Sequence, residues 1–248
     1  MSTPTLICDP GPITTLRFNR PEKRNALTVA TYEALAEALG RARDDDEVRV
    51  VLFAGQPGVF TAGNDILDFA ERPPAGEGSP VFRFLEALVD FPKPIVAAVD
   101  GPAIGVGTTM LAHCDLVVAS ARARFQLPFV NLGLVPEAAS TLLLPLFVGQ
   151  ARASRWLLLG EPIDAPAALE AGLVSELVEP DALEARARAL CEALAAKPPE
   201  ALRQTKQLLR AGWRDAVHAA LAREGAAFVE RLRSPEAAQA FAAFLTRK

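Results

Sequence analysis

The amino-acid sequence predicts an α/β fold with a helical C-terminal region, and three observations support this prediction. Short apolar runs alternate with amphipathic segments of helical period in the first half of the chain. From Glu137 onward the pattern becomes mainly helical. The chain has 248 residues, 50% of them hydrophobic, which is enough for one large domain or for one domain with an appendage. Alternation of this kind favours a sheet whose faces are covered by helices.

The first half of the chain supplies most of the predicted sheet. Thr15–Asn19 has the pattern of a strand, and Thr28 is suited to cap a helix. The apolar face of that helix follows the i, i+3, i+4, i+7 spacing, with Tyr32, Leu35, Ala36 and Leu39. The next expected elements are a strand at Val48–Phe53, a helix with Val81, Phe84, Leu85 and Leu88, a strand at Pro94–Val99, a short helix at Gly107–His113 and a strand at Asp115–Ser120.

The second half is expected to form a helical layer that packs on the core, on a neighbouring subunit, or on both. Asp164 is suited to cap a helix that ends at Gly172, and Leu173–Val178 contains a short strand. The Pro- and Gly-rich stretch Glu71–Pro80 is expected to be an exposed loop. Four further helices are expected at Asp181–Lys197, Glu200–Ala211, Asp215–Arg233 and Pro235–Arg247.

Composition and charge exclude several classes of protein. The net charge of −4 argues against a uniformly basic surface for nucleic acid. No apolar run reaches the ~18 residues of a membrane span, and no secretory signal is recognised, so a cytoplasmic protein is expected. The cysteines are scattered and odd in number, which favours free thiols in a reducing compartment. They are Cys8, Cys114 and Cys191.

Several catalytic signatures are absent from the sequence. It contains no G-x-S-x-G, P-loop, H-E-x-x-H or C-x-x-C motif, and no metal site is expected. Of the two histidines, His113 lies in an apolar segment and is expected to be a satisfied core residue. His218 lies on a polar helix and is expected to be solvated. A hydride-transfer or catalytic-triad enzyme would need parts that this sequence does not show.

Two loops containing glycine follow buried strands. They are FTAGND (Phe60–Asp65) and DGPAIGVGTT (Asp100–Thr109), and the second opens a helix. Small residues let backbone N–H groups approach a ligand, and a helix N-terminus adds unpaired donors with partial positive charge. One N–H from each loop would form an oxyanion hole. Both loops can equally be simple tight turns, because glycine is the default turn residue.

Several motifs in a fixed order extend over nearly the whole chain. They are RPEKRNALT (Arg20–Thr28), FTAGNDI (Phe60–Ile66), FPKPIVAAVDGPAIGVGTT (Phe91–Thr109), CDLVVASARARF (Cys114–Phe125), NLGLVPEAAS (Asn131–Ser140) and GEPIDAPAALEAGLVSELV (Gly160–Val178). With these motifs the sequence resembles the crotonase superfamily of enoyl-CoA hydratases and isomerases. The resemblance implies a crotonase-like spiral of ββα units over residues 1–190 and a C-terminal helical trimerisation region over residues 191–248. It also implies a homotrimer or homohexamer that acts on acyl-CoA thioesters, with no metal and no cofactor beyond the coenzyme A of the substrate.

The resemblance also assigns site residues by position. The oxyanion-hole donors fall on the backbone N–H groups of Asn64 and Val106. Because a backbone group donates, the identity of the side chain matters little at either position. Asp after a glycine turn commonly makes a local Asx hydrogen bond, so a structural or CoA-loop role is expected for Asp65. The substrate and its CoA are expected to pass along Arg24, Ala26, Ala62, Gly63, Asp65 and Ile66.

The carboxylates decide which member of the superfamily the chain resembles. The two glutamates of the hydratases fall on Thr109 and Phe129, and neither residue is a carboxylic acid. Glu137 instead matches the single glutamate of peroxisomal-type Δ3,Δ2-enoyl-CoA isomerases. One carboxylate could move a proton from C2 to C4 of a 3-enoyl thioester through a dienolate. Phe69, Phe129 and Leu132 are candidates for an apolar lining, and Thr109 for contact with a water or the acyl chain.

The expected function is therefore an isomerase of fatty-acid β-oxidation or related acyl-CoA breakdown. A hydratase, or another acyl-CoA lyase or hydrolase of the same fold, is the alternative. Loss of both hydratase glutamates also leaves open a non-catalytic acyl-CoA-binding protein. Glu137 is expected in the first turn of a helix, where such acids are common for structural reasons. Burial should raise its pKa, and the helix dipole should oppose that shift.

Overall fold

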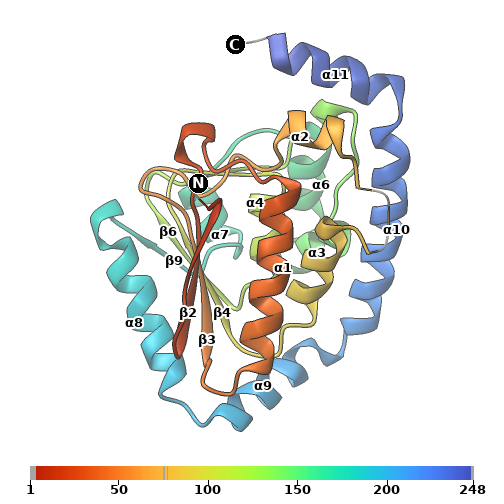
Figure 1. Cartoon of the computed structure of the whole chain (residues 1–248). Coiled ribbons are helices and arrows are strands. Elements are labelled where there is room, and N and C mark those ends of the chain that lie inside the picture. The colour runs from red at the N-terminus through yellow and green to blue at the C-terminus, as the bar shows by residue number, and fades with distance from the viewer. Residues whose placement is uncertain (1–3, 75, 77, 247–248) are drawn as a thin grey trace.

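The computed structural model describes residues 4–74, 76 and 78–246. Its core is a six-stranded sheet with the strand order β1-β2-β3-β4-β6-β9, joined by a three-stranded sheet with the order β5-β7-β8 (Figure 1). The α/β class expected from the sequence is confirmed. The strands are β1 (Leu6–Asp9), β2 (Ile13–Phe18), β3 (Val50–Ala54), β4 (Ile95–Val99), β5 (Pro102–Ile104), β6 (Leu116–Ser120), β7 (Arg124–Gln126), β8 (Ile163–Asp164) and β9 (Glu176–Val178).

The large sheet is parallel from β2 to β9, and only β1 runs antiparallel to its neighbour. Every residue of β3 and of β4 is buried. This burial explains why both strands are continuous apolar runs and do not alternate with polar residues, as is usual for a parallel sheet covered on both faces. Parallel strands also need long crossovers, and the helices of the first half provide them.

Helices cover the two faces of this sheet separately. On one face α8 (Leu183–Ala195) presses Leu183, Ala187 and Cys191 onto alternate residues of β3 and β4. On the other face lie α1 (Val29–Asp44) and α3 (Pro80–Val89), which also pack on each other (Figure 1). This second face holds the larger apolar core and leads to the site described below.

Helix α1 forms for the reasons that its sequence suggests. The side chain of Thr28 accepts a hydrogen bond from the backbone N–H of Thr31, and the Thr31 side chain accepts one in return from the Thr28 N–H. This reciprocal cap satisfies two N–H groups that the helix cannot pair internally. Tyr32, Leu35 and Leu39 are buried on the inner face, so the predicted start and apolar face are confirmed.

The short second sheet gives the chain its spiral of repeated ββα units. After β3 the chain forms a single parallel bridge between Thr61 and Ala103. After β4 it continues into β5 and then α4 (Val106–Thr109), and after β6 it continues into β7. Strands β3, β4 and β6 are therefore each followed by a step along the same second sheet. These turns stack the loops that follow β3 and β4 against each other.

The last third of the chain is helical, as expected, and wraps around the core. Helix α10 (Arg214–Leu232) lies beside α3 and α5 (Ser140–Val148), and α11 (Pro235–Thr246) packs against the 3-10 turn Val130–Leu132 (Figure 1). The boundary expected after residue 190 falls within α8, which belongs to the sheet core; a trimerisation role for the helices beyond it stays a prediction. The remaining helices are α2 (Ile66–Glu71), α5 (Ser140–Val148), α6 (Gln150–Leu159), α7 (Ala165–Glu170), α9 (Pro199–Ala211), α10 (Arg214–Leu232) and α11 (Pro235–Thr246).

Two local expectations need correction, and three short strands were missed. The segment Gly107–His113 is not one helix, because α4 ends at Thr109 and a 3-10 helix continues from Met110 to His113. The segment Glu71–Pro80 is not exposed throughout, since Pro74 is buried; Ala75 and Glu77 lie outside the described residues. Strands β5, β7 and β8 were not foreseen, because runs of two or three residues carry no periodic signal.

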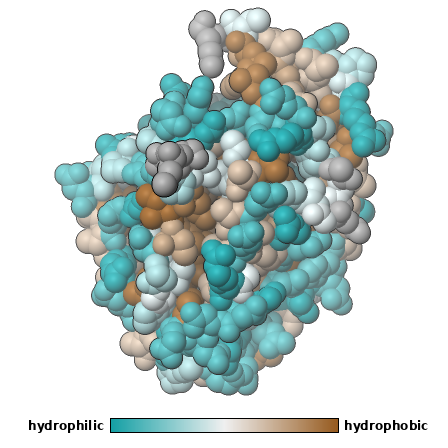
Figure 2. Space-filling model, in the orientation of Figure 1, coloured by the Kyte–Doolittle hydropathy of each residue, from teal (hydrophilic) through white to brown (hydrophobic). Residues whose placement is uncertain are grey.

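None of the helices in the described part of the chain is long and apolar enough to cross a membrane. The molecular face shown in Figure 2 is mostly hydrophilic, with hydrophobic surface near the outer end of α11, the helix that carries the 55% exposed Phe244.

Candidate active site

The loop Phe60–Asp65 is held in close backbone contact with the loop that follows β4. The N–H of Ile104 donates to the carbonyl of Thr61 at 3.0 Å. Gly63 has a φ of 82°, and a Cβ built on it would lie 2.6 Å from the Ile104 carbonyl oxygen. Only glycine combines this left-handed backbone with so close an approach. The two loops singled out from the sequence are therefore neighbours in space.

The second loop turns sharply at Gly105, whose φ of 56° and ψ of −118° place Val106 at the start of α4. A Cβ on Gly107 would lie 2.5 Å from Cγ2 of Thr61 in the first loop. The helix thus opens directly against the Phe60–Asp65 loop, and its first N–H groups have no partner inside the helix.

The backbone N–H groups of Asn64 and Val106 are available to a ligand at this junction. A parallel bridge pairs Leu27 with Asn64, and it uses the Gly63 carbonyl and the Asp65 N–H. Within residues 4–246, apart from the undescribed positions 75 and 77, no acceptor is found for the N–H of Asn64 or of Val106. Buried backbone donors are nearly always paired, so these two are suited to receive an oxygen atom from outside the chain.

Tyr32 supports the first of these donors. Its hydroxyl donates a hydrogen bond to Oδ1 of Asn64, and the side chain is fully buried on α1. Burial raises the pKa of Tyr32 well above its usual range, and the nearby Glu137 carboxylate raises it further. Sequence reasoning placed Tyr32 only on the apolar face of a helix. The sequence did contain a signal for this role, because a tyrosine on the apolar face of a helix is buried and its hydroxyl then needs a hydrogen-bond partner.

Replacing Tyr32 by phenylalanine is expected to weaken both the fold and the site. The change removes the donor to Asn64 Oδ1 and leaves that buried acceptor unpaired, which costs about 1–3 kcal/mol. Urea unfolding should show this loss, and kcat should fall more than KM rises, because the Asn64 loop would lose its anchor. Tyr32→Trp is unsuitable as a control because of its size. Phe84→Leu, on the neighbouring α3 and 5.7 Å from the Tyr32 ring between centroids, loosens the same core without removing the Asn64 contact and so tests for nonspecific effects. Unchanged stability and kcat in Tyr32→Phe would refute this role.

Glu137 is a buried carboxylate that contacts α4, the helix that begins at Val106. Its side chain is only 6% exposed. The expectation that it lies in the first turn of a helix is wrong. Ala138 and Ala139 both adopt left-handed backbone conformations, with φ of 61° and 55°, and α5 begins only at Ser140. A place in the first helical turn therefore does not explain this residue.

Thr109 connects Glu137 to the second loop. The Thr109 hydroxyl donates to Oε1 of Glu137 at 2.5 Å, from the last residue of α4. Burial raises the pKa of Glu137 to about 7; the Thr109 hydrogen bond opposes this shift, and the charge of Glu224 adds to it. The expected upward shift of the pKa is confirmed. Such a carboxylate can both take and return a proton near neutral pH.

Backbone hydrogen bonds tie the Arg24–Leu27 segment to the Phe60–Asp65 loop, which contains several residues of the expected coenzyme A path. The carbonyl of Arg24 accepts a hydrogen bond from the Ala62 N–H, and Ala26 is half-buried beside Leu27. Asn25, missed by sequence reasoning, is 1% exposed and donates through Nδ2 to the carbonyls of Val59 and Phe60. Its place in the RPEKRNALT motif was the available signal.

Asp65 has the structural role that was expected. Its Oδ1 accepts from the N–H groups of Leu67 and Asp68 and so caps α2, which begins at Ile66. Its Oδ2 accepts from Arg20 Nη1 at 2.7 Å. These contacts account for the carboxylate without any part in proton transfer.

The three apolar lining candidates lie in two places. Phe69 is buried on α2, with its ring 6.5 Å from that of Tyr32 and edge-on to Phe228 of α10 at 6.5 Å between centroids. Phe129 is buried and Leu132 half-buried at the turn that packs on α6 and α11. Phe69 therefore packs near Tyr32, whose hydroxyl contacts Asn64. A lining role for Phe129 and Leu132 stays a prediction.

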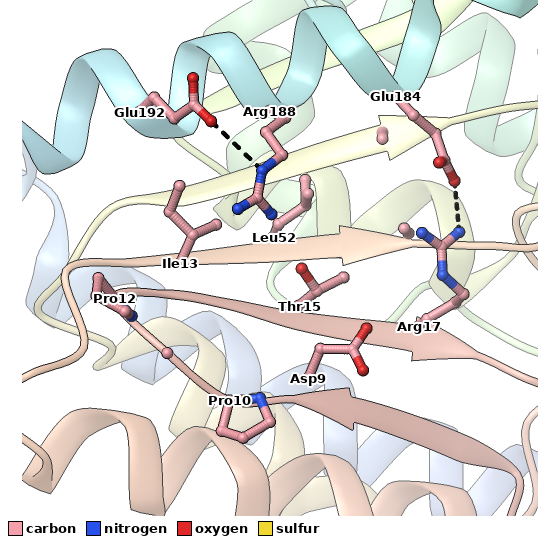
Figure 3. A pocket seen from close by; sticks show the side chains of 13 residues that line it. Asp9, Pro10, Pro12, Ile13, Thr15, Arg17, Leu52, Glu184, Arg188 and Glu192 are labelled. Atoms are coloured by element: carbon pink, nitrogen blue, oxygen red, sulfur yellow. Dashed lines mark ion pairs between the residues drawn. The ribbon is translucent and has the colours of Figure 1, made fainter.

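Other polar groups have structural partners. His113 is 2% exposed and its Nε2 lies 2.8 Å from the Ala138 carbonyl oxygen, so the expected core role is confirmed. His218, expected to be solvated, is half-exposed and lies 3.1 Å from Asp90. A groove of about 480 Å³ lies between α8 and the strands β1 and β2 (Figure 3). Its arginines Arg17 and Arg188 pair with Glu184 and Glu192, and it contains none of the predicted site residues.

Comparison with known proteins places this arrangement in context. Residues 10–248 match the family model described as enoyl-CoA hydratase/isomerase. The chain is 36% identical to "Enoyl-CoA delta isomerase 2" of Rattus norvegicus over 98% of this chain and 63% of that protein. It is 37% identical to "2,3-dehydroadipyl-CoA hydratase" of Escherichia coli over 94% of this chain and 92% of that protein. The chain thus spans less than two thirds of the length of the rat relative.

A solved structure has almost the same fold. The structure of Pseudomonas aeruginosa OdaA superposes with a TM-score of 0.96 and 44% identity, covering 99% of this chain and all of that one.

Proposed function

Because this chain belongs to the enoyl-CoA hydratase/isomerase family, we propose that it is a Δ3,Δ2-enoyl-CoA isomerase, which converts 3-enoyl-CoA to trans-2-enoyl-CoA. The family and the crotonase-like fold expected from the motifs are confirmed by the same comparisons. The observation that carries the proposal is the buried carboxylate of Glu137, with a pKa of about 7, which accepts a hydrogen bond from Thr109, the last residue of α4.

The proposed reaction needs one base and one oxyanion site. The Glu137 carboxylate takes a proton from C2 of the 3-enoyl thioester. Electron density moves onto the thioester oxygen, which the N–H groups of Asn64 and Val106 stabilise by hydrogen bonds. The double bond between C3 and C4 shifts to C2–C3 when the protonated Glu137 returns the proton to C4. No water enters or leaves, and the buried setting of Glu137 suits a reaction from which water is excluded.

The residues at the two hydratase positions support an isomerase over a hydratase. Thr109 can orient Glu137 but is not a general base at neutral pH, and Phe129 cannot transfer a proton at all. With one carboxylate, the site could not both activate a water and protonate carbon by the usual pair of acids.

Enoyl-CoA hydration is the second candidate, because a relative of similar identity is named a hydratase. In that case Glu137 would activate a water, and the same acid would then have to protonate carbon. The substrate class, an acyl-CoA thioester, is common to both proposals. A homotrimer or homohexamer, a cytoplasmic location, a place in fatty-acid β-oxidation and the absence of any further cofactor belong to the proposal as well.

Parallel assays on two substrates test the proposal. Purified protein is incubated with 3-enoyl-CoA and, separately, with trans-2-enoyl-CoA, and the ultraviolet band of the conjugated thioester is followed. An isomerase should produce the band from the first substrate, with no loss of intensity from the second beyond the reverse equilibrium. Loss of the band with formation of 3-hydroxyacyl-CoA would overturn the isomerase in favour of the hydratase. Binding of both esters without turnover would overturn both and favour an acyl-CoA-binding protein.

A further inference from the structure

A second carboxylate, that of Glu224, is buried at the start of the helix that follows Glu137. Glu224 is on α10 and is 6% exposed. Its Oε1 accepts hydrogen bonds from both the N–H of Thr141, at 2.8 Å, and the Thr141 hydroxyl. Thr141 is the second residue of α5, so a side chain from the C-terminal helices reaches the start of the helix that follows Glu137.

The start of α5 depends on this contact from outside. Its N-cap residue is Ala139, whose side chain cannot accept a hydrogen bond. Ala138 and Ala139 are also both left-handed, a conformation that costs a non-glycine residue about 1–2 kcal/mol each. Such a segment persists only when its surroundings fix it. Two contacts supply that restraint. Glu224 accepts a hydrogen bond from the Thr141 N–H, and the His113 ring lies 2.8 Å from the Ala138 carbonyl oxygen.

The capping contact does not by itself explain why this residue is an acid. Oε2 of Glu224 is buried and has no hydrogen-bond partner among the described residues. A glutamine could accept from Thr141 equally well through its one carbonyl oxygen. An unpartnered buried carboxylate oxygen normally lowers stability, so its presence calls for another use.

We propose that Glu224 is a positioning residue for Glu137: it anchors the segment Ala138–Thr141 to α10 and places a second negative charge beside the base. The inference rests on the proposed isomerase function for its kinetic consequences, whereas the anchoring is independent of that function.

The electrostatic surroundings of Glu137 support the second part of this proposal. The Thr109 hydroxyl donates a hydrogen bond to Glu137, the charge of Glu224 raises the pKa of Glu137, and the charge of Glu137 raises the pKa of Tyr32. His113, near the next residue, stays neutral because burial lowers its pKa to about 4. Glu224 is thus the one further charge among them, and its anionic form makes it harder to ionise Glu137. The resulting base is stronger, which favours removal of a proton from carbon.

Hydrogen-bond donors near Glu224 act against the rise that burial causes in its pKa. Burial raises its pKa, but the Thr141 hydroxyl and the backbone N–H groups of Thr141, Ala139 and Ser140 all act to lower it. The two Thr141 donors lie at the N-terminal end of α5, where the helix dipole also favours an anion.

The variants Glu224→Gln and Glu224→Ala separate anchoring from charge. Glutamine keeps the acceptor for Thr141 and removes the charge, whereas alanine removes both. Glu230→Gln, on the exposed side of the same helix, is the matched control. Three quantities are measured for each variant: the pH profile of kcat/KM and of kcat on 3-enoyl-CoA, the melting temperature, and the hydrogen–deuterium exchange of residues 138–142.

The wild-type profile should rise through a midpoint near the pKa of Glu137, about 7. In Glu224→Gln the midpoint should fall by about 0.5–1 pH unit, because a like charge has been removed. Its exchange rates and KM should stay close to those of the wild type, while kcat at high pH should decrease. In Glu224→Ala, exchange over residues 138–142 should accelerate and kcat should drop at least ~10-fold further, in line with a misplaced base.

Two results would overturn the inference in an active enzyme. One is a Glu224→Gln profile with the wild-type midpoint, and the other is a Glu224→Ala variant with wild-type exchange at residues 138–142. If the wild type itself fails to turn over 3-enoyl-CoA, the proposed function is refuted. The anchoring can still be tested in that case, by comparing the hydrogen–deuterium exchange of residues 138–142 between the alanine and glutamine variants.

Discussion

Replacing Glu137 by glutamine is expected to lower kcat on 3-enoyl-CoA by about 10²–10⁴-fold, the usual contribution of a positioned general base. The amide has nearly the same shape as the acid and can still accept the Thr109 hydrogen bond, but it cannot take a proton from C2. KM should change little, since the N–H groups of Asn64 and Val106 remain in place. Steady-state kinetics at pH 8, where the wild-type Glu137 is ionised, measures this difference most directly.

The same substitution is expected to stabilise the fold at alkaline pH. The pKa of Glu137 is raised from 4.5 to about 7, so folding favours the protonated acid. That contribution is fully present below pH 4.5 and is lost as the pH rises through 7. A shift of this size corresponds to up to about 3 kcal/mol of folding free energy. The wild type loses this stabilisation as Glu137 ionises, whereas the neutral glutamine variant does not. The advantage of Glu137→Gln in urea unfolding should therefore grow between pH 5 and pH 8, over the interval set by the two pKa values.

Glu33→Gln is the control for both measurements, because Glu33 is exposed on the outer face of α1. It should leave kcat and the pH dependence of stability as in the wild type. Retention of more than a tenth of the wild-type kcat by Glu137→Gln would show that another group moves the proton. An inactive Glu137→Gln that is also less stable at pH 8 would contradict the assigned pKa.

Replacing Val106 by proline should lower kcat by about 10²–10³-fold, because it deletes one of the proposed oxyanion-hole donors. A backbone N–H cannot be removed by an ordinary substitution, but proline removes it. Val106 is the first residue of α4, a position that proline occupies readily, and its N–H has no partner among the described residues. Gly105 before it has no Cβ to collide with the proline ring.

Val106→Ala separates the N–H from the side chain. Val106 is 1% exposed, so truncation should destabilise the fold by roughly 1–3 kcal/mol while the donor is kept. We expect the alanine variant to retain kcat within a few-fold at a temperature where both variants are folded. Equal kcat in the proline and alanine variants would mean that the Val106 N–H does not contact the developing oxyanion.

The elements with strong local signals could be predicted from the sequence. Thr28 precedes a clear helical period, and the apolar runs of β3 and β4 have the composition and length of buried strands. The glycines of the two loops also indicated close backbone approach, which Gly63 confirms. The assignment of Asn64, Val106 and Glu137 came from the resemblance of ordered motifs, because no spacing in the sequence relates these three residues in space.

The remaining features depend on contacts between distant parts of the chain. The left-handed pair Ala138–Ala139 has no local signature, since alanine normally favours a right-handed helix; the sequence therefore suggested that α5 begins at Glu137. Tyr32 and Glu224 were not recognised because each acts on a partner far along the chain, Asn64 and Thr141. Their roles follow from burial and hydrogen-bond pairing, which only the folded structure supplies.

The contact between Glu224 and Thr141 has a consequence for the order in which the protein matures. During synthesis the neighbouring strands β2, β3, β4 and β6 emerge in the order in which they pair, so the sheet can begin to form early. The segment that carries Glu137 is anchored only after α10, near the C-terminal end of the chain, has been synthesised. Nascent chains stalled before residue 224 should therefore contain a protease-resistant sheet without a competent base, and catalytic activity should appear only after translation is almost complete.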